Sequence, residues 1–335
     1  MSKEKSCSFK TSVGGSAVIE GVMMLGPKKM AVTVRKPDGE LTQRITEVSK
    51  KATAIKKIPI LRGVVNFFGS MVTSVSALMY SAEFFDVEEE EAEPSKFEKW
   101  LEEKLGDKLT SVIIVFSVIL SLAMSIGLFF FLPMLIINGV EYLFSLLPGG
   151  GTGILVAVAE NGSRHLHQIP RSLVEGVVRI SIFLAYVGLA SKQKDVRRLF
   201  EYHGAEHKTI FCYEAGLPLT VENCRKQTRL HPRCGTSFLV FVMIISIILF
   251  AFVPSTILLW QRLLLKLALL PVVAGVSYEI IKWAGRSDGK LVRILSKPGL
   301  WLQKITTREP DDDELLVAIA SMEAVIPEQR EDGKW

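Results

Sequence analysis

The stretch LTSVIIVFSVILSLAMSIGLFFFLPMLII, residues 109–137, contains no charged side chain and decides the class of fold. A helix needs about 20 consecutive apolar residues to cross the hydrocarbon core of a bilayer. Residues 109–137 exceed that length and leave room for tilt. The sequence therefore predicts a membrane protein with at least one spanning helix.

Three more apolar runs follow this one. Residues 236–261 are uncharged, residues 172–190 hold only Glu175 and Arg179, and residues 262–284 carry their charges towards the ends. Apolar and charged residues are thus segregated along the chain. This segregation explains how a chain of 335 residues can be 49% hydrophobic and 22% charged. We expect an α-helical membrane protein with about four transmembrane helices, a small N-terminal β-hairpin unit and cytoplasmic helices.

Basic residues predict the orientation of these helices, because Lys and Arg accumulate in cytoplasmic loops. The loop 138–171 has only Arg164 and Arg171, whereas nine basic residues lie in the loop 191–235: Lys192, Lys194, Arg197, Arg198, Lys208, Arg225, Lys226, Arg229 and Arg233. We expect a multipass protein of the bacterial inner membrane, with both termini and the loop 191–235 in the cytoplasm. The cysteines of that loop are then reduced thiols, available to a metal.

The N-terminal segment alternates like a β-hairpin. Residues 30–35 and 41–48 alternate apolar and polar side chains, and Pro37-Asp38-Gly39 between them is a strong turn signal. Residues 17–19 are a candidate third strand. If the protein is a scaffold, this hairpin is expected to dock a partner.

Four parts of the chain follow from this pattern. They are a cytoplasmic β-rich unit at 1–58, interfacial helices with an acidic linker at 59–108, a transmembrane bundle at 109–284 that includes the loop 191–235, and a cytoplasmic helical tail at 285–335. Residues 60–85 are expected to form a helix at the cytoplasmic face, although full insertion stays an alternative. Residues 97–105 and 311–322 are expected to form further helices.

Potential metal ligands are concentrated between Tyr202 and Ser237, which hold three of the five histidines and three of the four cysteines. On a helix, His203 and His207 lie one turn apart on one face, a separation that lets two imidazoles bind one ion. The third ligand is His231 or Cys234. A cysteine favours a divalent metal of the zinc type over a hard ion.

Glu206 precedes the second histidine. The order His-x-x-Glu-His is that of an inverted zinc-peptidase motif, in which the glutamate is the general base that activates water. Glu206 is therefore the candidate catalytic residue. In the alternative interpretation, Glu206 pairs with Lys208 or Arg198 and the histidines are structural.

Five blocks of the chain resemble the YqhQ-like family. They are Gly14-Gly-Ser-Ala-Val-Ile-Glu-Gly-Val-Met-Met24, Tyr202-His-Gly-Ala-Glu-His-Lys-Thr209, Leu219-Thr-Val-Glu-Asn223, His231-Pro-Arg-Cys-Gly-Thr-Ser237 and Leu302-Gln-Lys-Ile-Thr-Thr-Arg-Glu-Pro310. The resemblance implies a bacterial multipass membrane protein with a domain of unknown function, commonly labelled a predicted metal-dependent enzyme. That label rests on the same His, Glu and Cys motifs.

Three functions are compatible with these features. The favoured one is a membrane-embedded metal-dependent hydrolase with its site at the cytoplasmic face. The second is a non-catalytic membrane scaffold or membrane-protein biogenesis factor, in which the Cys/His cluster is structural. The third is a transporter or channel subunit that uses Glu175, Arg179 and Glu279 as polar positions in the membrane. On a helix, Glu175 and Arg179 pair with each other or make a polar contact inside the bundle.

The expected partners follow from the same features. Membrane lipids surround the spans, and a membrane-protein partner or a second copy of the chain is compatible with each function. The formal net charge of +5 is ordinary for a membrane protein. We therefore expect no nucleic-acid partner.

Overall fold

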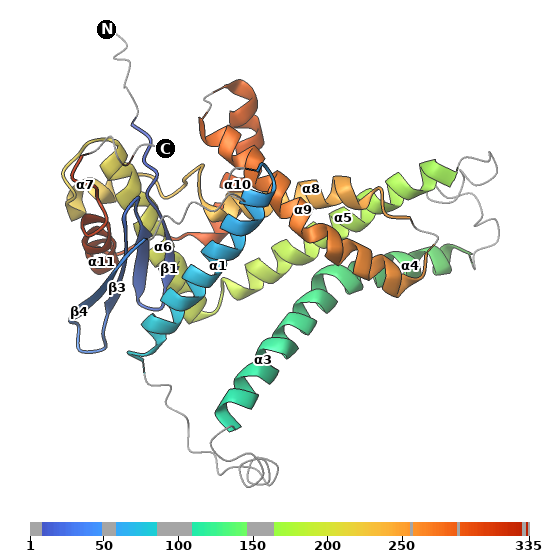
Figure 1. Cartoon of the computed structure of the whole chain (residues 1–335), viewed down its shortest axis with the longest axis horizontal. Coiled ribbons are helices and arrows are strands. Elements are labelled where there is room, and N and C mark those ends of the chain that lie inside the picture. Colours follow the sequence, from blue (N-terminus) through green and yellow to red (C-terminus); the bar gives the residue numbers. More distant parts are fainter. Residues whose placement is uncertain are drawn as a thin grey trace. The chain divides into compact units, whose positions relative to one another are not determined.

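The computed structural model in Figure 1 describes residues 9–48, 58–85, 109–145, 164–254, 257–286, 289–329 and 333. The acidic linker and the helix predicted at 97–105 lie outside the described residues. The chain divides into two compact units that each combine distant segments. The first unit comprises residues 1–85, 186–246 and 269–335, and the second comprises residues 86–185 and 247–268.

The first unit contains one antiparallel sheet in the order β1-β2-β3-β4. Its strands are β1 (Gly14–Val18), β2 (Gly21–Leu25), β3 (Lys29–Arg35) and β4 (Leu41–Glu47). The predicted hairpin is β3–β4, whose connection contains Gly39 at a φ of 86°.

The sequence predicted a hairpin with a candidate third strand, whereas the sheet has four strands, because β2 was not predicted. Its first four residues are all buried, so the alternation typical of a half-exposed strand is absent. The segment around Ala17 pairs with β2 and lies at the edge of the sheet beyond it.

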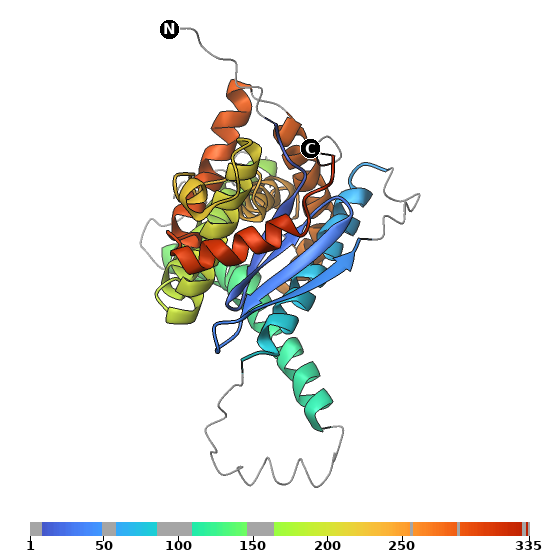
Figure 2. The same ribbon diagram turned by 90° about the vertical axis from the view of Figure 1, so that its left-hand side faces the viewer.

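Helices cover both faces of this sheet (Figures 1 and 2). On one face, Val22 and Met24 share a core with α6 (Lys194–Glu214) and α11 (Asp312–Glu323). On the other face, Met23 packs with Ala77 of α1 (Leu61–Ala82). The period of two along β2 thus divides the interior into two cores, one on each side of the sheet.

Helix α11 begins as its acidic first turn predicts. The Asp311 side chain accepts from the Glu314 N–H at 2.8 Å, and the Glu314 carboxylate accepts from the Asp311 N–H at 2.9 Å. This reciprocal arrangement is a capping box. The helix predicted at 311–322 is confirmed.

The remaining helices are mostly apolar. They are α3 (Leu109–Ile126), the π-helical turn η3 (Gly127–Phe131), α4 (Leu132–Ser145), α5 (Arg164–Ala190), α7 (Val221–Arg225), α8 (Gly235–Phe250), α9 (Leu259–Arg286) and α10 (Lys290–Thr306). Among the residues that the structure describes, four stretches are long and apolar enough to span a membrane: Leu61–Ala82, Phe116–Val140, Pro170–Ala190 and Leu259–Ala284.

The four candidate spans among the described residues agree in number with the four that the sequence predicted, but one predicted span is replaced by another helix. The uncharged run 236–261 is not one helix, because α8 ends at Phe250 and α9 begins at Leu259. Helix α8 is apolar but short, whereas α1 meets the length and composition of a span. Residues 236–261 are apolar throughout, so their hydropathy does not reveal that one helix ends and another begins within them.

A buried polar cluster lies within the second unit. Glu175 bonds Arg179 at 2.9 Å on its own helix, and its other partners are Arg262, at 3.0 Å, and Lys266 of α9. All four side chains are at most 7% exposed. The predicted Glu175–Arg179 pair is confirmed, and it belongs to a larger polar contact inside the bundle.

Candidate metal centre

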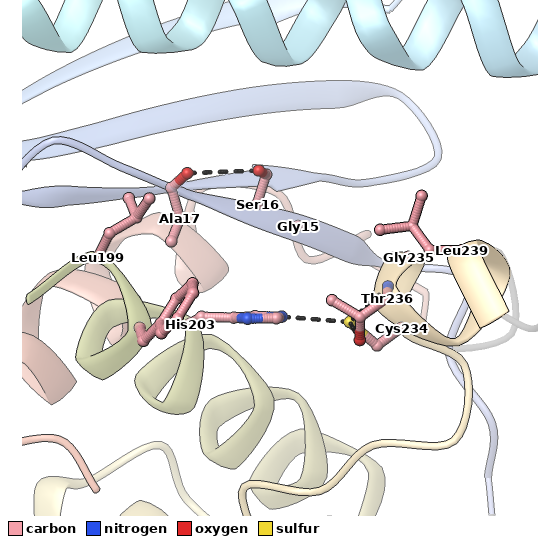
Figure 3. Close-up of a pocket in the computed structure, with 10 residues that line it drawn as sticks. Gly15, Ser16, Ala17, Leu199, His203, Cys234, Gly235, Thr236 and Leu239 are labelled. Atoms are coloured by element: carbon pink, nitrogen blue, oxygen red, sulfur yellow. Dashed lines mark hydrogen bonds between the residues drawn. The ribbon is translucent and has the colours of Figure 1, made fainter. Parts of the chain in front are cut away.

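Helix α6 places His203 and His207 side by side, with ring centroids 4.5 Å apart. Cys234 stands immediately before α8, and its Sγ lies 3.2 Å from His203 Nε2 (Figure 3). The three donor atoms lie within 4.8 Å of one another. Tetrahedral ligands at ordinary zinc distances are about 3.5 Å apart, so small adjustments let the three hold one ion.

Backbone carbonyls orient both imidazoles. His203 Nδ1 lies 2.8 Å from the Thr306 carbonyl oxygen, and His207 Nδ1 lies 2.6 Å from that of Arg229. A carbonyl only accepts, so each Nδ1 carries the proton and each Nε2 can face a metal. Sequence reasoning missed these two carbonyls, because the backbone of any residue type can supply such a contact.

Two polar atoms at this centre are buried without a hydrogen bond to any described residue. They are His207 Nε2 and Glu206 Oε2. Leaving a buried polar atom unsatisfied costs about 1–3 kcal/mol. A cation held by His203, His207 and Cys234 would give His207 Nε2 a partner, and Glu206 Oε2 is open to a proton donor.

The charges of the centre also suit a cation. Burial alone would raise the pKa of the Cys234 thiol, but the imidazoles of His203 and His207 hold it well below its usual value. Thr236 supports the thiolate with its N–H at 3.5 Å and its hydroxyl at 3.3 Å. Burial would lower the pKa of His203, but the Cys234 sulfur raises it to about 9.

Glu206 lies next to the histidines and is 4% exposed. Burial raises the pKa of its carboxyl group, although the Gly15 N–H donates to it. A Cβ on Gly15 would lie 3.0 Å from the Glu206 Cδ, so the glycine lets β1 approach this carboxyl closely. Gly15 was not singled out as a site residue, although it stands in the first of the family-like blocks.

The alternative partners suggested for Glu206 are occupied elsewhere. Lys208 Nζ donates to the carbonyls of Arg225 and Gln227 at 3.0 and 2.8 Å. Arg198 pairs with Glu20 at 2.6 Å and with Glu314 at 3.2 Å. Glu206 therefore makes no ion pair with either cation.

The structure brings Cys234, rather than His231, together with the two α6 histidines. The His231 ring lies 5.5 Å from that of His207, between centroids, but its Nε2 faces Glu214 at 3.8 Å. Burial lowers the pKa of His231, which favours the neutral ring. Its backbone N–H and carbonyl both bond the Gln303 side chain at 2.7 Å, which fixes the turn before Cys234.

The other two described cysteines lie apart from the centre. Cys212 and Cys224 are free thiols in the core between α6 and the sheet. Burial raises the pKa of Cys212, and it raises that of Cys224 to about 12. Their placement agrees with the helical spacing, which directs Cys212 away from His203 and His207.

Gly204 brings the C-terminal segment against the centre. A Cβ on Gly204 would lie 2.0 Å from the Arg308 carbonyl oxygen. The Arg308 N–H donates to the Phe200 carbonyl at 2.8 Å, which ties the segment to α6. This contact positions the nearby Thr306 carbonyl that orients His203.

A pocket of about 260 Å³ opens beside His203 and Cys234 (Figure 3). Its walls come from β1, α6 and the start of α8, and its lining residues are Gly15, Ser16, Ala17, Leu199, Phe200, His203, Cys234, Gly235, Thr236 and Leu239. Most of these side chains are apolar or small. The pocket gives a small molecule or a chain segment access to the two ligand side chains.

Comparison with known proteins agrees with the sequence blocks. The family described as "Protein of unknown function (DUF1385)" matches residues 58–328. The chain is 34% identical over 331 residues to "Uncharacterized protein YqhQ" of Bacillus subtilis (strain 168), covering 97% of this chain and 95% of that protein. No solved structure matches. Neither description names an activity, but both place the protein: it belongs to the DUF1385, or YqhQ-like, family.

Proposed function

We propose that this protein is a metal-dependent hydrolase of the membrane, with His203, His207 and Cys234 holding a divalent ion of the zinc type. The observation that carries the proposal is the convergence of both Nε2 atoms and the Cys234 Sγ while both Nδ1 atoms bond carbonyls. Metal-ligating histidines show this arrangement because it fixes the tautomer and the ring orientation.

Three protein ligands favour catalysis over a closed structural site. Structural zinc sites use four protein ligands, whereas catalytic sites keep one position for water or substrate. Within the part of the chain that the structure describes, the ligand group has three members. A zinc ion held by these residues would supply an activated water and would polarise a carbonyl group.

Glu206 supplies the general base. Its Oε2 forms no hydrogen bond to a described residue, so it is available to a proton. Burial raises the pKa of this carboxyl group, which makes it a better proton acceptor than an exposed glutamate. The N–H of Gly15 holds the carboxyl in place, and the adjacent pocket admits the group to be cleaved.

The membrane location belongs to the same proposal. Within the described residues, four helices have the length and composition of spans. On α9, the exposed Trp260 and Trp283 stand near the first and the last residues of the helix. Tryptophan is enriched at both membrane–water interfaces. The nine basic residues of the loop 191–235 support a position of the centre on the cytoplasmic side of the inner membrane.

Metal analysis of the purified full chain tests the proposal. We expect about one zinc ion per chain in the wild type, and loss of the ion in His203→Ala, His207→Ala and Cys234→Ala. Glu206→Gln should keep the ion and reduce hydrolysis by roughly 100-fold or more, since it removes only the base.

Cys212→Ala is the matched control, because it removes a cysteine from the same helix but not from the centre. Folded wild-type protein that stays metal-free when supplied with zinc would contradict the proposal. Full metal occupancy with unchanged hydrolysis in Glu206→Gln would contradict the role of Glu206 as the base, and full occupancy without any hydrolysis by the wild type would favour the non-catalytic scaffold.

One observation favours a second candidate, a cysteine nucleophile. His203 Nε2 lies 3.2 Å from Cys234 Sγ, and Thr236 donates to the sulfur, as an activated thiolate requires. This candidate leaves His207 Nε2 and Glu206 Oε2 unexplained. Alkylation separates the two: a nucleophile reacts with iodoacetamide in the presence of zinc, whereas a metal ligand is protected until a chelator is added.

A further inference from the structure

Helix α10 has an inner face that supports the metal centre. The Thr306 carbonyl accepts from His203, and Gln303 bonds both backbone groups of His231. A Cβ on Gly299 would lie 2.6 Å from the Ser237 Oγ, so α10 packs closely against the start of α8. The orientation of α10 is therefore fixed by close contacts, and so is the direction in which its outer face points.

The outer face of α10 is divided lengthwise into an apolar strip and a basic strip. Leu291 and Ile294 are both 59% exposed, and Trp301 is 63% exposed. At 3.6 residues per turn, the exposed side chains occupy one arc of roughly 160°. The basic members of that arc are Lys290, Arg293, Lys297 and Lys304, and α10 contains no acidic residue.

These four cations make no ion pair with any residue that the structure describes. Elsewhere in the same unit, Arg198, Arg229 and Arg233 all bond carboxylates. An unpaired basic strip beside an exposed apolar strip is complementary to the surface of an anionic bilayer. Cations meet phosphate groups there, and apolar side chains enter the acyl boundary.

The connection between α9 and α10 also supports a position of α10 at a membrane surface. The candidate span on α9 ends at Ala284, and α10 begins at Lys290. A helix that starts so few residues after a span starts at the interface. Trp283, 48% exposed at the end of that span, is the kind of side chain found at this level.

We propose that the outer face of α10 lies in the membrane interface and binds anionic lipid headgroups through Lys290, Arg293, Lys297 and Lys304. The inference rests on the proposed membrane location. Since the inner face of the same helix orients His203 and the turn at His231, this contact holds the candidate metal centre at the lipid surface.

Tryptophan quenching tests the proposal on the full chain in lipid nanodiscs. The Trp301 signal is the difference between the wild type and Trp301→Phe. Brominated phosphatidylglycerol should quench this signal several-fold more than brominated phosphatidylcholine at the same mole fraction, because basic residues near a membrane surface attract anionic headgroups. Replacing Arg293, Lys297 and Lys304 together by Gln should abolish that preference.

Replacing Arg197, Arg225 and Lys226 together by Gln is the control, since it removes the same charge from exposed sites on other helices and should keep the preference. Quenching of Trp260 and Trp283 without quenching of Trp301 would overturn the role of α10 and leave the membrane location intact. Equal quenching by both lipids would overturn the selection of anionic headgroups. Absence of quenching at every tryptophan would overturn the membrane location itself.

Discussion

At the scale of single residues, the ability of the centre to bind a metal depends on whether His203 and Cys234 carry protons. The Cys234 thiol is deprotonated readily, and the pKa of His203 is raised to about 9 by that sulfur. Below that pH, His203 holds a proton at the Nε2 that faces Cys234. A metal ion and this proton compete for the same position.

Zinc binding should therefore release about one proton per ion near pH 7.5. The release should decline towards zero as the pH rises above 9, and zinc affinity should increase by about tenfold per pH unit below that value. Titration calorimetry in two buffers of different ionisation enthalpy measures the proton count. His231→Asn should behave like the wild type, and proton-neutral binding at pH 7.5 would contradict the assignment.

At the scale of elements, α6 carries the histidines and also receives the C-terminal segment. Its contact with Arg308 depends on Gly204, where a Cβ has no room. The face that binds this segment lies one residue from His203. Gly204, which packs against the C-terminal segment, is therefore adjacent in sequence to the candidate metal ligand His203.

Gly204→Ala should lower the stability of the folded protein by about 3 kcal/mol, because the added methyl group forces Arg308 away from α6. The displaced segment includes Thr306, so zinc occupancy should fall as well. Gly188→Ala is a matched control, since no atom lies within 4 Å of its added Cβ. Thermal unfolding and metal content measure both effects, and equal melting temperatures would show that the segment adapts freely.

The start of α11 predicts a pH dependence. Burial raises the pKa of Glu314 to about 7, against 4.5 for an ordinary carboxyl group. The folded protein thus holds this proton more tightly than the unfolded chain does. The stability that Glu314 contributes is present below pH 4.5 and is lost as the pH rises through 7.

Glu314→Gln should gain stability relative to the wild type as the pH rises from about 5 to about 8, because the amide stays neutral and still accepts from the Asp311 N–H. Denaturant unfolding at both pH values measures the difference. Glu323→Gln, at the exposed end of the same helix, should show no such trend. A constant difference between Glu314→Gln and the wild type would count against the raised pKa.

At the scale of the whole molecule, the candidate metal centre and the buried charge cluster around Glu175 belong to different units. The metal centre belongs to the first unit, and Glu175 with its three basic partners belongs to the second. Removing one partner of a buried ion cluster leaves uncompensated charge and typically costs about 3–5 kcal/mol.

Glu175→Gln should therefore lower the melting temperature strongly while zinc stoichiometry in folded protein stays unchanged. Ser181→Ala, on the exposed side of the same helix, should leave the melting temperature close to that of the wild type. Differential scanning fluorimetry with metal analysis measures both quantities. A normal melting temperature together with altered solute flux in liposomes would favour the transporter hypothesis.

Local patterns in the sequence were sufficient for much of the architecture. Apolar runs marked three of the four described helices that are long enough to span a membrane, Pro37-Asp38-Gly39 marked the β3–β4 turn, and the acidic residues after Pro310 marked the start of α11. The four-residue spacing placed His203 and His207 on one face of α6. Each of these features depends on interactions between residues that are close in the sequence. Composition and periodicity therefore predict them directly.

Only the tertiary structure decided which distant groups meet. It selected Cys234 over His231, supplied the carbonyls of Thr306 and Arg229, and brought Gly15 to Glu206. It also assembled three cations around Glu175 and added β2 to the sheet. These contacts join segments up to about 190 residues apart, and their geometry depends on packing against the rest of the fold, which no local pattern records.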